Sequence, residues 1–111
     1  MAFAAGGADI AARDAAFWQA FLARGAAVRA RVPQQHPEYA RVLAALENVP
    51  IQIRAQQSRD GGVMAGHYYQ LGYVRDQAGV LRGMLAMGYA EEARKILEFR
   101  YAKWKRYGNM T

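Results

Sequence analysis

The sequence predicts an all-α protein of about four helices that pack as antiparallel αα-hairpins. Alanine, the strongest helix former, is used heavily, and apolar residues make up 53 % of the chain. Apolar side chains recur at helical spacing in several segments, and no pair of segments has the pattern of paired strands. A length of 111 residues allows one domain at most, so we expect a single helical unit over residues 1–111.

The first two helices are predicted over residues 9–32 and 37–57. Asp9 or Asp14 can cap the first helix, because a short acceptor side chain satisfies the free N–H groups of a first turn. Gly25 is a weak point in this helix, and the prolines of VPQQHP at 32–37 end it. Pro50 predicts a kink or a break in the second helix. We expect the following IQIRAQQS to be helical rather than extended. The apolar stripe of the first helix contains Ile10, Phe17, Phe21, Val28 and Val32.

A loop is predicted over residues 58–74, followed by helices over 76–87 and 90–107. Asp76 is the expected N-cap of the third helix, and Gly88 is a suitable residue for its C-terminal end. The connection to the last helix is so short that the two helices must form an antiparallel αα-hairpin. Glu91 and Glu92 lie in the first turn of the last helix, where we expect them to be surface residues that compensate the helix dipole.

The bulk composition limits the classes of function. The net charge of +6 raises the question of nucleic acid, although only KWKRYG at 103–108 is a dense basic cluster. The chain has no cysteine and no apolar run long enough to span a bilayer, and its N-terminus does not have the pattern of a secretion signal. We therefore expect a cytoplasmic protein without a membrane partner.

The segment HYYQLGYVRDQAG is the richest in groups that could bind a ligand. Arg75 offers a fork of donors and Asp76 offers two acceptor oxygens, so the pair can bind neighbouring sugar hydroxyls. Tyrosine supplies a flat apolar face with a hydroxyl tip. The structural alternative is that Asp76 caps a helix, that Arg75 forms a surface ion pair, and that the rings pack in a core. The rings are Tyr68, Tyr69 and Tyr73, with His67 beside them.

No catalytic motif or metal site is predicted, and no cofactor is implied. His67 has no second histidine, cysteine or acidic cluster at ligand spacing. Glu91 and Glu92 are neighbours on a helix and face different directions, so they cannot flank one glycosidic bond. The last helix offers a different possibility at 100–107, where aromatic and basic residues interleave. The alternative function is therefore a small helical interaction module or one that binds single-stranded nucleic acid. Such rings more often face a core, and we consider nucleic acid the less favoured partner.

Residues 51–99 resemble the opening of the catalytic domain of glucoamylase-like, six-hairpin glycoside hydrolases. The resemblance lies in Gln56–Gln57, Gly61–Gly62, Tyr68–Tyr69, YVRD at 73–76, Gly88 and EEARKILEF at 91–99. It implies an (α/α)6 barrel and a carbohydrate substrate. By position, Arg75 and Asp76 would hydrogen-bond the hydroxyls of the sugar in the cleavage subsite, and Tyr69 would stack on its ring or contact one of its oxygens. Tyr73 stands where the family usually has tryptophan.

A complete barrel of twelve helices does not fit in 111 residues, so the chain is either an N-terminal fragment of such an enzyme or a small α-helical protein that resembles one locally. The family hydrolyses its substrate with a general acid and a general base, which are contributed by later helices of the barrel. We therefore expect part of a sugar-binding subsite without catalytic residues. Helices missing from the barrel would leave an apolar patch exposed, so self-association of the isolated chain is expected. The predicted patch contains Leu81, Met84, Leu85 and Ile96.

Overall fold

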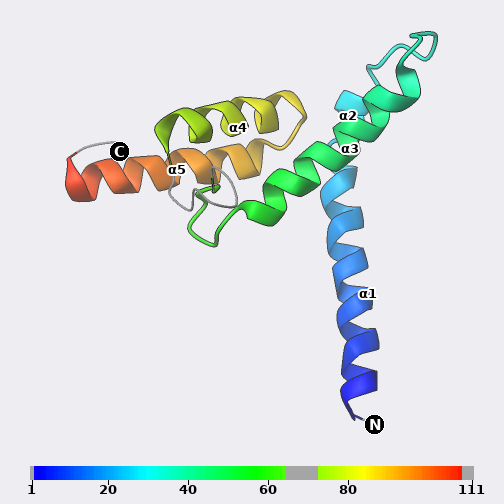
Figure 1. Ribbon diagram of the computed structural model, residues 1–111, viewed down its shortest axis with the longest axis horizontal. Coiled ribbons are helices and arrows are strands. Elements are labelled where there is room, and N and C mark those ends of the chain that lie inside the picture. Colours follow the sequence, from blue (N-terminus) through cyan, green and yellow to red (C-terminus); the bar gives the residue numbers. More distant parts are fainter. Residues whose placement is uncertain (1, 65–72, 109–111) are drawn as a thin grey trace.

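Helices make up most of the described chain, which confirms the all-α class. The computed structural model describes residues 2–64 and 73–108. Within these residues the only β-type pairing is a single bridge between Gln57 and Val63. The helices are α1 (Ala2–Ala23), α2 (Ala26–Arg29), α3 (Tyr39–Gln56), α4 (Val74–Ala86) and α5 (Ala90–Tyr107) (Figure 1).

Helix α1 begins earlier and ends earlier than the sequence predicts. Asp9 and Asp14 lie inside it, so the prediction that either residue caps the helix is wrong; Asp9 instead pairs with Arg13 one turn later at 2.8 Å. The helix extends back to Ala2 through a stretch with four alanines, which favour this conformation without a packing partner, and it continues through Gly6 and Gly7. The weak point at Gly25 is confirmed, because α1 ends at Ala23 and Gly25 precedes the separate single turn of α2.

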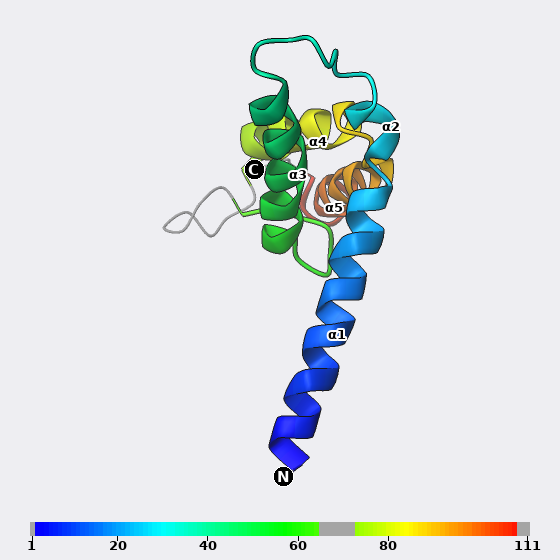
Figure 2. The ribbon, with the colours of Figure 1, turned by 90° about the vertical axis from the view of Figure 1, so that its right-hand side faces the viewer.

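Only the last turns of α1 pack against the rest of the protein. Its N-terminal part projects away from the other helices in both views (Figures 1 and 2). Residues 6–17 are exposed, including Ile10 and Phe17 of the predicted apolar stripe, whereas Phe21 is buried. The stripe therefore reaches a core only at its C-terminal end.

Helix α3 runs through Pro50 without ending there. It begins at Tyr39, close to the predicted start, and continues to Gln56, which confirms the helical interpretation of residues 51–56. The break considered at Pro50 does not occur. Pro50 is fully buried, and Ile51 and Ile53 pack against the core, so tertiary contacts hold the helix together despite the missing N–H.

Helices α4 and α5 form the predicted antiparallel hairpin. Gly88 ends the connection after α4 with a φ of +98°, a left-handed conformation that favours glycine, and the N–H of Tyr89 bonds the carbonyl of Met84 at 2.8 Å. The bounds of α5 match the prediction, and Gly108 caps its C-terminus. Helix α4 starts at Val74, two residues before the predicted start.

The core lies where the hairpin meets the end of α1. Phe21, Met84, Tyr89 and Ala93 form one buried cluster. The rings of Phe21 and Tyr89 stack with centroids 4.4 Å apart and an interplanar angle of 15°. Met84 and Ile96 are fully buried, so the prediction that they belong to an exposed apolar patch is wrong. Of the four residues predicted for that patch, only Leu85 is exposed. Leu81 is partly buried and packs against the core.

The overall shape is open rather than spherical. The radius of gyration of the Cα atoms is 16.8 Å, whereas a compact domain of this length has about 13 Å. None of the described helices has the length and apolar content needed to cross a membrane.

Candidate functional site

The start of α4 carries the predicted sugar-binding residues that the structure describes, namely Tyr73, Arg75 and Asp76. His67, Tyr68 and Tyr69 lie outside the described residues. Tyr73 occupies the N-cap position with an extended backbone, at φ −64° and ψ 139°. Its side chain is 43 % exposed, so the ring is not part of the core. The described part of the candidate site is therefore one exposed helix start.

Arg75 and Asp76 do not have the structural roles that we considered as alternatives. Asp76 lies within the first turn of α4 rather than at its N-cap, and no side chain caps this helix, so the capping prediction is wrong. Among the described residues, neither Arg75 nor Asp76 forms a side-chain hydrogen bond or an ion pair. Arg75 is exposed and Asp76 is half-buried. No partner within the described residues therefore occupies the donors of Arg75 or the acceptors of Asp76.

A buried glutamine holds this helix start in place. Gln77 is 1 % exposed, and its amide bonds the backbone of Val63 in both directions. The N–H of Val63 donates to Oε1 of Gln77 at 2.9 Å, and Nε2 of Gln77 donates to the carbonyl of Val63. Because Gln77 directly follows Asp76, this reciprocal pair fixes the beginning of α4 against the preceding loop.

A second glutamine closes the loop onto α5. Nε2 of Gln57 donates to the carbonyl of Gly61 at 2.9 Å and to the carbonyl of Glu92 at 3.1 Å.

Gln77 was not among the functional or structural residues predicted from the sequence. Its spacing could have identified it, since Gln77, Leu81 and Met84 follow the i, i+4, i+7 pattern of one buried helix face.

The two adjacent glutamates of α5 lie in different environments. Glu91 is exposed and accepts hydrogen bonds from Arg94, at 2.5 Å and 3.1 Å. This hydrogen bonding lowers the pKa of the Glu91 carboxyl, with the nearby positive charges adding to the effect. Glu92 is buried and paired with Arg24, which directly follows α1, so the expectation that both glutamates are surface residues is wrong for Glu92. Each of the two carboxylates is therefore paired with its own arginine.

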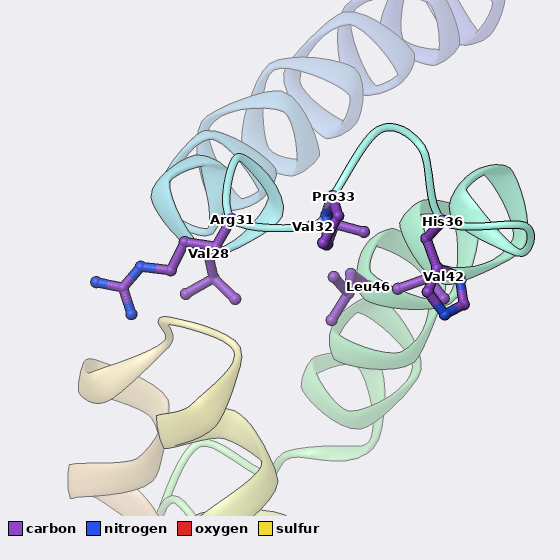
Figure 3. A pocket seen from close by; sticks show the side chains of 7 residues that line it. All are labelled: Val28, Arg31, Val32, Pro33, His36, Val42 and Leu46. Carbon is purple, nitrogen blue, oxygen red and sulfur yellow. The ribbon is translucent and has the colours of Figure 1, made fainter.

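An apolar pocket of about 350 Å³ lies between the α2 region and α3, away from the start of α4. Figure 3 shows that the guanidinium of Arg31 points away from the other labelled side chains. No group of polar atoms converges on this pocket, and it brings together none of the predicted site residues. It is lined by Val28, Arg31, Val32, Pro33, His36, Val42 and Leu46.

Metal binding finds no support in residues 2–64 and 73–108. No three histidine, cysteine, aspartate or glutamate side chains gather there in a way that could hold an ion.

The C-terminal half of α5 is exposed and aromatic. Tyr101, Trp104 and Tyr107 are 57 %, 50 % and 55 % exposed, so the expectation that these rings face a core is wrong. The rings of Tyr101 and Trp104 lie nearly parallel, with centroids 5.9 Å apart and an interplanar angle of 25°.

Comparisons of the chain with protein-family models, curated proteins and solved structures found no match. The likeness of residues 51–99 to six-hairpin glycoside hydrolases therefore rests on the motifs quoted above.

Proposed function

We propose that this chain contributes one wall of a sugar-binding subsite and that it belongs to a glycoside hydrolase of the six-hairpin class. The observation that supports the proposal is that the side chains of Arg75 and Asp76 have no partner among the described residues. Both side chains stand at an accessible helix start, and within the described residues neither one caps the helix nor forms an ion pair.

The chemistry of these side chains suits a sugar. A hydroxyl group both donates and accepts, so the guanidinium of Arg75 and the carboxylate of Asp76 can bind two neighbouring hydroxyls. The exposed ring of Tyr73 offers an apolar face for the C–H side of a pyranose. The resemblance adds Tyr69 as a contact to the sugar, and Tyr68 and His67 are further candidates from the sequence.

The proposed role is binding rather than bond cleavage. Hydrolysis requires two carboxyl groups that flank the scissile bond, one acting as acid and the other as base or nucleophile. Glu91 is paired with Arg94, and Glu92 is buried against Arg24. In a longer protein containing this chain, the acid and base would come from other helices, as they do in the six-hairpin family.

Titration of the ¹⁵N-labelled chain with neutral sugars tests the proposal. Glucose, rhamnose, trehalose and maltose should be added separately while the backbone and arginine N–H signals are followed by NMR. We expect millimolar binding of at least one sugar, with shifts concentrated at residues 73–77. Asp76→Asn and Arg75→Gln should each weaken this binding at least tenfold.

The chain contains a matched control, because Arg59 and Asp60 are a second exposed Arg-Asp pair that lies in the loop before α4. Arg59→Gln and Asp60→Asn should leave the titration unchanged. Equal losses in both pairs of variants, or shifts that avoid residues 73–77, would show that the start of α4 is not a sugar site.

A further inference from the structure

The C-terminal half of α5 combines exposed rings with positive charge, and the proposed sugar subsite uses neither. Leu97, Tyr101 and Trp104 follow one another at i, i+4 and i+7 and therefore share a helix face. All three side chains are at least half exposed. Among the described residues no element covers this face, although α5 is otherwise well packed through Ala93 and Ile96.

Lysine and arginine side chains surround the rings. The Nζ of Lys105 lies 5.7 Å from the ring centroid of Tyr101, and the Nζ of Lys103 lies 5.7 Å from that of Tyr107. The guanidinium of Arg106 lies 5.1 Å from the ring of Tyr107. These cation–π contacts place charge beside the exposed rings along the C-terminal part of α5.

Among the described residues, Lys103, Lys105 and Arg106 form no ion pair. Residues 99–107 contain no aspartate or glutamate. The nearest acid along the helix, Glu98, is already paired with Arg94. The surface therefore has a positive potential that attracts a polyanion.

We propose that this surface, formed by Tyr101, Lys103, Trp104, Lys105, Arg106 and Tyr107, binds single-stranded nucleic acid. Exposed rings stack on unpaired bases, and the neighbouring cations contact the phosphates that connect them. A duplex fits less well because its bases are already stacked and paired. A second copy of the chain also fits less well, since a symmetric contact would bring the two sets of cations together. The proposal does not depend on the sugar subsite.

Fluorescence of Trp104 gives a direct test. The chain has two tryptophans, so Trp18→Phe leaves Trp104 as the sole reporter. Titration with the oligonucleotide dT12 should quench this fluorescence as bases stack on the ring. If three phosphates are contacted, affinity should fall about 20-fold between 50 and 200 mM salt. Tyr101→Leu should weaken binding about tenfold through the loss of one stacking platform.

Two triple variants separate a specific surface from general basicity. Lys103→Gln combined with Lys105→Gln and Arg106→Gln should remove most of the salt dependence and weaken binding at least tenfold. The control combines Arg31→Gln, Arg59→Gln and Arg82→Gln, which remove the same charge from exposed positions that pair with no acid in the described chain. This control should retain the salt dependence. Circular dichroism checks that each variant keeps its helices.

Three results would overturn the proposal. One is equal affinity for dT12, for the corresponding duplex and for dextran sulfate, which would indicate a polyanion surface without base stacking. The second is equal loss of binding in the two triple variants. The third is an absence of quenching at 50 mM salt. Asp76→Asn should leave dT12 binding unchanged, so failure here is distinguishable from failure of the sugar-subsite proposal.

Discussion

The guanidinium of Arg24 donates two hydrogen bonds to the carboxylate of Glu92, at 2.5 Å and 3.2 Å. The pair joins the end of α1 to the first turn of α5, across 68 residues of sequence. Glu92 is buried and Arg24 is partly exposed, so the carboxylate depends on this partner more than the guanidinium does. The guanidinium also lies over the rings of Phe21 and Tyr89, at 5.3 Å and 5.7 Å from their centroids.

Replacing Arg24 by Gln should lower the free energy of unfolding by about 2 kcal/mol, because the buried carboxylate of Glu92 would lose its charged donor. Urea denaturation followed by circular dichroism measures the change. Arg94→Gln is the matched control, since it removes an arginine paired only with exposed glutamates, and it should change stability by less than about 1 kcal/mol. Equal effects of the two variants would contradict a structural role for the Arg24–Glu92 pair.

Gly25→Ala should destabilise the protein by about 1–3 kcal/mol through overpacking. A Cβ atom at Gly25 would lie 2.6 Å from the hydroxyl oxygen of the buried Tyr89 and 2.9 Å from Nη1 of Arg29. Gly79→Ala in α4 provides the opposite case, because its Cβ would meet no atom within 4 Å. That variant should gain about 0.5–1 kcal/mol from helix propensity. Thermal melts of both variants check the sign of each effect.

Gln77→Ala should release the loop before α4. The N–H and carbonyl of Val63 would lose their buried partner, at a cost of about 2 kcal/mol. We expect faster tryptic cleavage after Arg59, an exposed residue of the same loop. Gln56→Ala serves as the control, because the amide of Gln56 is exposed and bonds only within α3. Cleavage at the same rate in both variants would show that Gln77 does not hold the loop.

The carboxyl group of Glu91 should titrate below its ordinary pKa of 4.5, because Arg94 hydrogen-bonds its charged form. A lowered folded-state pKa means that this stabilisation is present above the unfolded pKa and is lost as pH falls through the folded pKa. NMR titration of the glutamate side chains measures the value directly. Arg94→Gln should raise the pKa of Glu91 toward 4.5. An unchanged titration in that variant would rule out the hydrogen bond as the cause.

Self-association of the isolated chain remains a prediction, but the structure changes the residues expected to cause it. Ile10 and Leu85 are 66 % and 52 % exposed, and exposed apolar side chains favour association. Light scattering at micromolar concentration should show species larger than the 12.4 kDa monomer. Ile10→Gln with Leu85→Gln should shift the sample toward monomer, whereas Ala11→Gln with Ala86→Gln should not. A monomeric parent chain would contradict the prediction.

Local signals in the sequence predicted the α4–α5 hairpin well. Gly88 and Gly108 both adopt the left-handed conformation that ends a helix, and the short connection fixes the antiparallel arrangement. The start of α4 was less predictable, because Asp76 is a good N-cap residue and equally suits a first turn. Local preference alone does not choose between these two positions.

Features that depend on distant partners could not be predicted from local patterns. The burial of Glu92 requires Arg24, and the continuity of α3 through Pro50 depends on packing by other segments. Helical periodicity places Tyr101 and Trp104 on one face of α5 but does not show whether another element covers that face. At the candidate site, adjacency in the sequence identified Arg75 and Asp76 as a donor and acceptor pair, while their lack of partners among the described residues became visible only in three dimensions.

The sequence separation between Arg24 and Glu92 also predicts an order of folding events. A short connection joins α4 and α5, so forming their hairpin costs little loop-closure entropy. Bringing α1 to α5 closes a much longer loop and costs more entropy. We therefore expect the hairpin to form first and to present Tyr89 and Glu92 as a ready surface on which α1 docks last. Strengthening this late contact should slow the undocking of α1 and leave the rate of hairpin formation almost unchanged.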